Sequence, residues 1–438
     1  TSPASVPGGD AAGAGTAGTG PAGTGLAGTE PAGTEPAART GRGVRVAVID
    51  TGVDLDHPAF GGTGVNGTTP FPNDVVVGGW DFVGDAYNEN PVLGSEYDAS
   101  ARPDARPDDC NGHGTHVAGL LAGRDGDPRF TGGPGVAAEA QLLAYRVFGC
   151  SGFTSADIVV SAFEAALADG ADVVNFSAAF VGMPWPDYPT AVAAQRLVGS
   201  GVVVVAAQGN DPSRSPGLFS SGAPGVAPDV ISVGAGTRNS VDDYSISGPS
   251  ATLGVKPDVI TEGRSLYSAY PVEKGWGGTA TGTSGAAPRV AGLAARLVEE
   301  FPSASVAEIG ARIVGTAVPV GSPGGYAPVP RHGGGHVDVT SRRAAETTVT
   351  VSPARLSFGE SSGGPRDIAL TVTNHSGAPV HLTLDHETAM AATGDPDAPS
   401  TTVAAATVTG DRAVTVPARG TATLRASVVA PGGDAGTL

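Results

Sequence analysis

Lysine is nearly absent from this chain of 438 residues: it occurs only at Lys256 and Lys274, and arginine supplies the remaining positive charge. Acidic residues number 43 against 25 basic ones, which gives a formal net charge of −18 at pH 7. Nucleic-acid-binding proteins need a basic surface, so this charge argues against a DNA or RNA partner and favours solubility instead. The sequence offers no explanation for the scarcity of lysine.

Long hydrophobic runs are also lacking. No run of about 18 apolar residues occurs, so the sequence predicts no membrane span. The chain begins with Thr1 rather than Met and shows no charged segment followed by an apolar one, as a secretory signal would. We therefore expect a mature form from which any targeting segment has been removed. Cysteine is scarce too, and Cys110 and Cys150 permit at most one internal disulfide.

The composition divides the chain into three parts. Residues 1–40 repeat the pattern AGTGP or AGTEP and contain almost no large apolar side chain. Such a segment buries too little surface to offset its ordering entropy, so it is either a linker to something upstream or a plain disordered tail. Residues 41–343 and 344–438 have the compositions of two folded domains.

The second part alternates short apolar strands with helical windows. This alternation is typical of an open α/β fold, a doubly wound and mostly parallel sheet with helices on both faces. A helix is predicted from Ser155 to Asp169, because a serine is a typical helix start and Gly170 is a typical stop. The predicted strands are Val44–Ile49, Leu142–Phe148, Val173–Phe176, Val202–Ala206, Val230–Val233 and Asp258–Ile260.

The third part reads as an all-β domain. Its short alternating runs are separated by Gly, Pro, Asn and Ser turns, which is typical of an immunoglobulin-like or fibronectin III-like sandwich. At about 90 residues it is slightly shorter than the ~100 residues typical of that sandwich. A last strand that is cut short would account for the difference. The runs are Thr347–Val351, Asp367–Thr373, Val380–Leu384, Ala413–Val416 and Thr421–Val429.

The segment Gly282–Pro288 has the pattern of an activated serine. Glycines on both sides of Thr283-Ser284 allow a sharp turn and leave room for a substrate beside the hydroxyl. The Ala- and Leu-rich residues from Ala286 to Glu300 predict a helix, in which Pro288 is tolerated only in the first turn. Ser284 would then lie at a helix N-terminus, which favours a developing oxyanion.

Two further motifs supply a base and its orienting group. Asp50 ends the first β-branched strand, at the edge where parallel sheets bind ligands. His113 opens a helix of small residues within Asn111-Gly112-His113-Gly114-Thr115-His116. A serine hydroxyl needs such a histidine to remove its proton, and the histidine needs a buried carboxylate to fix its tautomer.

In this order, the Asp, His and Ser motifs resemble those of the subtilase family of serine endopeptidases (peptidase family S8). Within the family, the sequence most resembles the secreted, Vpr-like bacterial members. The resemblance covers residues 43–340. It implies that Asp50 orients His113, that His113 is the general base and acid, and that Ser284 is the nucleophile. The segment Gly201–Asn210 is similar to the family's strand that ends in the oxyanion-hole asparagine, so Asn210 is assigned that role.

The resemblance also implies two substrate-binding segments that hold a peptide between them as an added strand. They are Ser151-Gly152-Phe153 and Ser177-Ala178-Ala179. Alanine stands in the second segment where the family usually has glycine, which leaves substrate preference open. Three other departures are Gly285 for the usual Met, Arg289 for a frequent His, and Glu262 for a Pro.

The two cysteines flank these motifs. We expect Cys110 and Cys150 to form a disulfide that ties two active-site loops together, which suits an oxidising compartment; the alternative is a pair of unrelated thiols. Calcium often stabilises subtilases, but no run of ligands like an EF-hand loop occurs. The acidic pairs Asp54 with Asp56 and Asp108 with Asp109 are expected to face solvent, so no metal is assigned and the chemistry needs no cofactor.

Three other histidines are left out of the predicted site. His116 is expected to pack inside the helix that His113 opens. His332 and His336 lie in a glycine-rich loop without a partner motif.

The sequence thus predicts an extracellular serine endopeptidase whose partners are protein or peptide substrates. Family resemblance adds an N-terminal propeptide as chaperone and inhibitor, which this chain does not contain. Two alternatives remain at this point: a processing peptidase or transpeptidase dedicated to one peptide, and an inactive subtilase-fold binding protein.

Overall fold

The computed structural model describes residues 39–90, 97–211, 213, 217–322, 325–360, 364–403 and 406–430. Residues 1–38, which make up nearly all of the predicted linker, lie outside the described residues. None of the described helices is both long and apolar enough to cross a bilayer.

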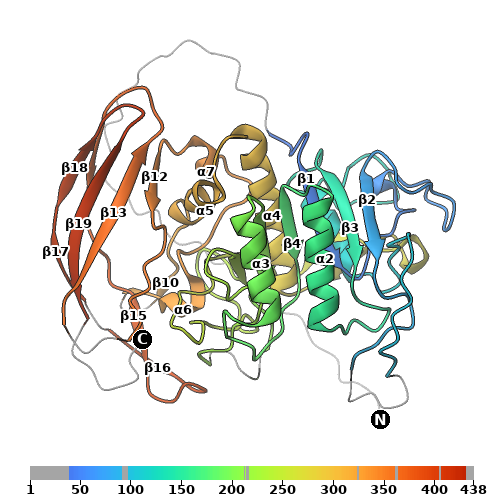
Figure 1. The fold of residues 1–438 in the computed structure, drawn as a ribbon, viewed down its shortest axis with the longest axis horizontal. Coiled ribbons are helices and arrows are strands. Elements are labelled where there is room, and N and C mark those ends of the chain that lie inside the picture. Colours follow the sequence, from blue (N-terminus) through green and yellow to red (C-terminus); the bar gives the residue numbers. More distant parts are fainter. Residues whose placement is uncertain are drawn as a thin grey trace, which may run out of the picture. The chain divides into compact units, whose positions relative to one another are not determined.

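A seven-stranded sheet forms the centre of the first described region (Figure 1). Its strand order is β2-β3-β1-β4-β5-β6-β7, and every neighbouring pair is parallel. The predicted open parallel sheet is therefore confirmed. Its strands are β1 (Arg45–Asp50), β2 (Val76–Asp81), β3 (Gln141–Arg146), β4 (Val173–Phe176), β5 (Val203–Ala207), β6 (Ile231–Ala235) and β7 (Val259–Thr261).

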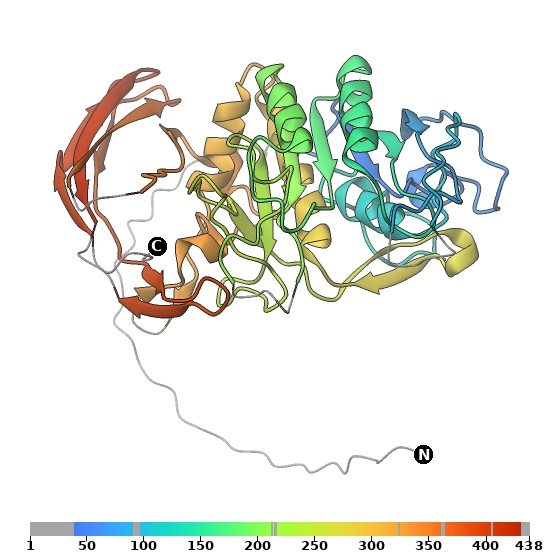
Figure 2. The same cartoon turned by 60° about the horizontal axis from the view of Figure 1, so that its bottom comes forward.

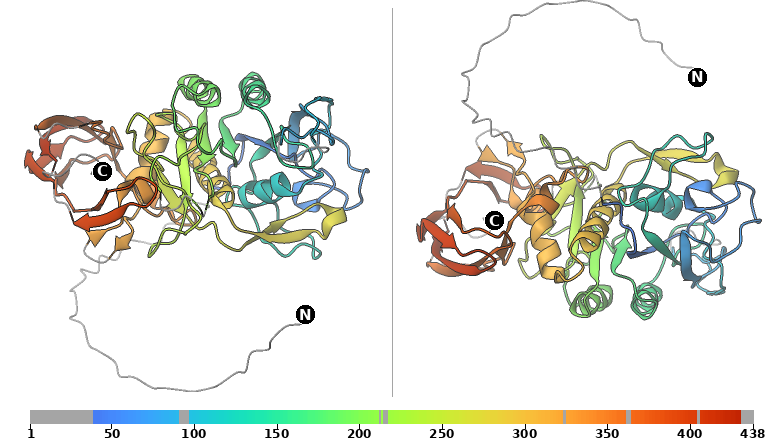
Figure 3. Two further views of the ribbon diagram at one scale, coloured as in Figure 1. Left: turned by 90° about the horizontal axis from the view of Figure 1, so that it is seen from below. Right: turned by 90° about the horizontal axis from the view of Figure 1, so that it is seen from above.

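Helices cover both faces of this sheet. In the central strand β1, Val46 and Val48 point into one apolar cluster while Ala47 and Ile49 point into the other. This alternation explains why residues 46–49 are all apolar, since both faces of the strand are buried there. The helices α2 (Ala156–Ala168) and α3 (Pro189–Gly199) lie together on one side in both views of Figure 3.

The opposite face carries the two helices whose first turns hold His113 and Ser284. They are α1 (His113–Ala122) and α4 (Thr283–Glu300), which pack against each other. Three further helices follow in the chain: α5 (Val306–Gly315), α6 (Val329–His332) and α7 (Arg343–Glu346). Single 3₁₀ turns are formed by Pro58–Phe60 and Val272–Lys274.

One detail of α4 differs from the prediction. The helix begins at Thr283, so Pro288 lies in its second turn and not in its first. A proline has no N–H to donate to the carbonyl four residues earlier, and that carbonyl belongs to Ser284. The turn that carries the predicted nucleophile therefore lacks one helical hydrogen bond.

Two small hairpins connect the main elements. The strands β8 (Leu266–Ala269) and β9 (Gly277–Ala280) pair antiparallel beside α1 (Figure 2). The second hairpin pairs β10 (Gly321–Ser322) with β11 (Gly325–Tyr326).

The C-terminal region is all-β and antiparallel, as predicted. Its largest sheet has the order β12-β13-β19-β17, and β14-β18 and β15-β16 are separate pairs. The cluster of fully buried side chains is small and consists of Val372, Val416 and Leu424. The strands are β12 (Val349–Ser352), β13 (Arg366–Asn374), β14 (Val380–Thr383), β15 (Met390–Thr393), β16 (Ser400–Val403), β17 (Thr407–Gly410), β18 (Ala413–Val416) and β19 (Thr421–Val429).

Candidate active site

The predicted site residues gather at one edge of the parallel sheet. Asp50 is the last residue of β1, and Asn210 follows β5 after two residues. The carboxyl ends of parallel strands meet at the same edge, so both side chains lie there. β1 is also the strand beside which the order of strands reverses, between β3 and β4. Ligands of open α/β sheets bind at such a position.

Asp50 and His113 are in direct contact. The Nδ1 atom of His113 lies 2.7 Å from Oδ1 of Asp50, which also accepts a hydrogen bond from the backbone N–H of Thr51. The Asp50 side chain is 1% exposed and that of His113 is 38% exposed, so the imidazole connects a buried carboxylate to the surface. A side chain at Gly114 would overlap the carbonyl oxygen of Gly52, so glycine lets α1 approach the end of β1.

The environment of His113 changes its basicity. Burial lowers the pKa of the imidazole, but the charge of Asp50 and the hydrogen bond to it raise that pKa by more, and the net shift is upward. A raised pKa makes the imidazole a stronger base, while more of it is protonated in mildly acidic solution.

Ser284 is the second residue of α4, so its backbone N–H has no partner within the helix. Its hydroxyl and the amide of Asn210 both lie beside Gly282. A Cβ at Gly282 would come within 2.9 Å of Oγ of Ser284 and within 3.2 Å of Nδ2 of Asn210. Glycine therefore keeps open the space between the hydroxyl and the amide.

Thr283 fixes the orientation of Asn210. Its backbone N–H donates to Oδ1 of Asn210 over 2.8 Å, and its hydroxyl donates to the same oxygen over 3.0 Å. Because both groups are donors, the amide must present its oxygen to Thr283 and its NH₂ to the space beside Ser284. The NH₂ group of Asn210 is thus directed toward the space beside the hydroxyl of Ser284.

A buried carboxylate that the sequence did not single out holds the segment before α1. Oδ1 of Asp109 accepts from the backbone N–H of Asn111 and Gly112 and from the hydroxyl of Thr51, over 2.8–3.0 Å. Its Oδ2 accepts from the N–H and hydroxyl of Thr115. Thr51 in turn accepts from the N–H of Gly114. Asp109 therefore connects the residues around His113 to the residue after Asp50.

The acidic pairs thus do not all face solvent, and that prediction was wrong. Asp54, Asp56 and Asp109 are buried, and each accepts backbone hydrogen bonds. Burial raises the pKa of Asp54 to about 7. The chain uses these carboxylates to order loops, since a short carboxylate accepts several N–H groups where no regular structure does.

Both lysines have structural roles, which the sequence could not assign. Nζ of Lys274, in the turn between β8 and β9, donates to the carbonyls of Cys110 over 2.6 Å and Asn111 over 2.9 Å. Lys256 is buried and pairs with Asp258 over 2.9 Å.

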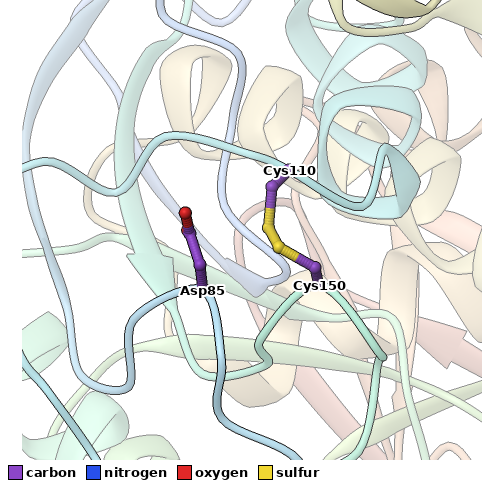
Figure 4. Close-up of side chains that lie close together, drawn as sticks. All are labelled: Asp85, Cys110 and Cys150. Atoms are coloured by element: carbon purple, nitrogen blue, oxygen red, sulfur yellow. A yellow bond between two sulfur atoms is a disulfide. The ribbon is translucent and has the colours of Figure 1, made fainter.

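The predicted disulfide between Cys110 and Cys150 is confirmed (Figure 4). It joins the segment before α1 to the segment after β3, and the amide of Asn111 donates to the carbonyl of Cys150 over 2.9 Å. Asp85 lies beside the two sulfurs. Because disulfide sulfurs are no longer thiolates, the three residues do not form a metal site.

The two predicted substrate-binding segments both follow strands of the sheet. Ser151–Phe153 come directly after the disulfide, and Phe153 is 46% exposed. Ser177–Ala179 come directly after β4. Beyond the second segment, Val181, Met183 and Trp185 also leave large apolar surfaces exposed.

Two of the three sequence departures form one cluster. Arg289 donates to the carboxylate of Glu262 over 2.6 Å, and Nε2 of His336 lies 2.9 Å from its other oxygen. His336, which the sequence left in a glycine-rich loop without a partner motif, thus contacts Glu262 in the structure. The third departure, Gly285, lies beside Leu266, whose Cδ1 would be 3.0 Å from a Cβ at that position. His116 is buried as expected, and its Nε2 lies 2.9 Å from the carbonyl oxygen of Leu266.

Comparison with known proteins identifies the family. The model of the Subtilase family matches residues 41–360. The chain belongs to this family. Subtilisin DY of Bacillus licheniformis is 34% identical over 282 residues, which are 64% of this chain and 86% of that protein.

Two other similarities extend the comparison. Minor extracellular protease Vpr of Bacillus subtilis (strain 168) is 35% identical over 209 residues, which cover 48% of this chain and only 22% of Vpr. The solved structure of a cold-adapted subtilisin-like serine proteinase has a TM-score of 0.49 and is 29% identical, over 65% of this chain and 85% of that one. The family model and the subtilisin relatives show that the chain is a serine peptidase of the subtilase family.

Proposed function

We propose that this subtilase is a secreted endopeptidase that cleaves peptide bonds through an acyl-enzyme on Ser284. In this proposal Asp50 orients His113, His113 is the general base and acid, and Asn210 stabilises the oxyanion. The contact of 2.7 Å between His113 and Asp50, at the same sheet edge as the fixed amide of Asn210, carries the proposal.

The reaction follows from these positions. His113 takes the proton of the Ser284 hydroxyl on Nε2 as Oγ attacks the substrate carbonyl carbon. The carbonyl oxygen becomes an oxyanion that accepts hydrogen bonds from Nδ2 of Asn210 and the backbone N–H of Ser284. His113 then gives its proton to the leaving amine, and water repeats the steps to release the acyl group.

The substrate would lie as an extended strand between residues 151–153 and 177–179. The exposed side chains of Phe153 and Val181 favour peptides with apolar residues near the cleaved bond. The side chain of Val181 lies within 3.1 Å of the position a Cβ on Gly209 would take, beside Asn210.

Secretion is supported by the disulfide, which persists in oxidising compartments, and by the extracellular location stated in the name of Vpr. Folding would use an N-terminal propeptide as chaperone and inhibitor, as the family resemblance implies, and catalysis needs no cofactor. The C-terminal region would be an immunoglobulin-like or fibronectin III-like sandwich that acts as a spacer.

Casein digestion with Ser284→Ala tests the proposal. The variant should lose all measurable cleavage while its thermal unfolding stays unchanged, because only the hydroxyl is removed. Ser161→Ala, at an exposed serine of α2, is the matched control and should cleave at the wild-type rate. Cleavage by a well-folded Ser284→Ala protein would refute the proposal. Sequencing the wild-type products separates a general protease, which yields many cleavage sites, from a dedicated one.

A further inference from the structure

A cavity of about 320 Å³ lies between the two helices that carry His113 and Ser284. Gly119 and Leu120 of α1 form one wall, and Arg289 and Arg296 of α4 form another. The loop Gly132–Val136 also borders it. None of the described residues that line this cavity is acidic, although the chain carries a net charge of −18.

The two arginines are placed to act together. They are seven residues apart on α4, which is two helical turns, so they lie on the same side of the helix. Nη1 of Arg296 donates to the carbonyl of Val339 over 3.1 Å, but its Nε is buried and has no hydrogen-bond partner among the described residues. The Arg296 side chain is half-buried and lines the cavity, so its guanidinium N–H groups without a described acceptor are available to a ligand there.

Glu262 does not supply an acceptor inside the cavity. It pairs with Nη1 of Arg289 and with His336, and it does not line the cavity. The hydroxyl of Ser268, which does line it, donates to the carbonyl of His116. Arg296 is left without a carboxylate partner among the described residues.

The glycine loop adds free backbone donors. The N–H groups of Gly135 and Val136 bond to carbonyls near the end of α1, which fixes the loop in place. The N–H groups of Gly132 and Gly133 donate to no described residue, and Gly133 has a φ of +71° that favours glycine. Successive free N–H groups in such a turn bind anions.

We propose that this cavity binds a tetrahedral oxyanion, inorganic phosphate or sulfate, between the guanidinium groups of Arg289 and Arg296 and the backbone of Gly132–Gly133. Arginine is suited to this ligand because its planar fork donates two hydrogen bonds at once. A bound oxyanion bridges α1, α4 and the loop, so it stabilises the pair of helices on which the proposed base and nucleophile are placed.

Phosphate titration of the whole chain tests this site. Calorimetry with inorganic phosphate, at constant ionic strength set with chloride, should give one saturable site. The melting temperature should rise by about 2 °C or more at saturation, because the ligand binds only the folded state. Sulfate should compete with phosphate, and acetate at the same concentration should not.

Variants separate a specific site from the general stabilising effect of these salts. Arg296→Gln should remove the calorimetric signal and the saturable part of the temperature shift. Arg102→Gln, at an exposed arginine paired with Asp98, is the control and should retain both. If Arg296→Gln does not fold, Arg296→Lys keeps the charge without the fork and should weaken phosphate binding at least tenfold. The proposal would be overturned if the wild-type protein gave no calorimetric signal with phosphate. It would also be overturned if the Arg296 variants gave the same signal as the wild type.

Discussion

The two halves of the proposed active site, Asp50 with His113 and Ser284 with Asn210, are supported in different ways. Asp50 and His113 depend on a network of side chains from distant segments: Asp109, Lys274 and the Cys110–Cys150 disulfide all act on the irregular residues before α1. Ser284 and Asn210 depend mainly on the start of α4 and on two hydrogen bonds from Thr283. His113 and Ser284 both lie at helix starts, so the difference is in the segment before each helix: several distant groups hold the one before α1, whereas Thr283 and Asn210 hold the start of α4.

This difference predicts where substitutions change chemistry and where they change stability. Changes to the groups proposed to contact the reacting atoms should affect the rate in either half. Changes to the supporting groups should mainly affect the stability of the half that they hold.

Asp50→Asn should have the largest effect. The amide cannot hold the imidazole in the productive tautomer, so kcat should fall about 10⁴-fold with little change in KM. The Asp50 carboxylate raises the pKa of His113, so its removal lowers that pKa. The acidic limb of the pH–rate profile should therefore move to lower pH in this variant. A profile that keeps its position would contradict the proposed role of Asp50.

Asn210→Ala tests the other half of the site. It removes one oxyanion donor, so kcat should fall by about 10² to 10³ while KM stays nearly constant. Gly282→Ala should reduce kcat in the same direction, because its methyl group would crowd Oγ of Ser284 and Nδ2 of Asn210. The pH–rate profile should not move in either variant, in contrast to Asp50→Asn. A shifted pH–rate profile in either of these two variants would mean that Asn210 and Gly282 also affect the pKa of His113.

The sequence predicted the parts of this site that local pattern determines. Asp50 at a strand end and Ser284 at a helix start follow from a β-branched run and a glycine-flanked motif, and the structure has both. Lys274 could not be predicted, because its carbonyl partners lie 164 and 163 residues away. Asp109 was missed because a paired aspartate in a loop looks the same whether it faces solvent or accepts hydrogen bonds.

The cluster around Glu262 shows the same limit. The departures at Glu262 and Arg289 are visible in the sequence, but only the fold shows that they compensate each other. Their separation of 27 residues gives no local signal for pairing.

Loss of the disulfide tests how the half of the site that contains Asp50 and His113 is supported. Cys110→Ser with Cys150→Ser opens a loop of 40 residues, which should lower the free energy of unfolding by about 4 kcal/mol. At a temperature where the variant is folded, kcat should fall only several-fold, because Asp109 and Lys274 still hold the segment. Urea unfolding and casein kinetics measure the two effects. A loss of activity as large as that of Asp50→Asn would make the disulfide part of the chemistry.

The Glu262–Arg289 pair should give the smallest effect. The Glu262 side chain is 41% exposed, so Glu262→Gln should cost about 1 kcal/mol of stability or less and leave kcat unchanged. Burial raises the pKa of Glu262, but the hydrogen bonds from His336 and Arg289 lower it by more. Its contribution is thus present above the unfolded pKa of about 4.5 and is lost as pH falls further.

A double-mutant cycle with Arg289→Met measures that pair. The cycle should give a coupling energy of about 0.5–1 kcal/mol at pH 7 that shrinks in acid. A coupling energy that is constant with pH would contradict an ionic pair.

The most direct test of the proposed mechanism is the site of covalent modification by a fluorophosphonate. Mass spectrometry of the labelled and digested wild-type protein should place one adduct on Ser284, and labelling of His113→Ala should be slower by several orders of magnitude. An adduct on another residue, or equally fast labelling without His113, would contradict a nucleophile activated by the Asp50–His113 pair.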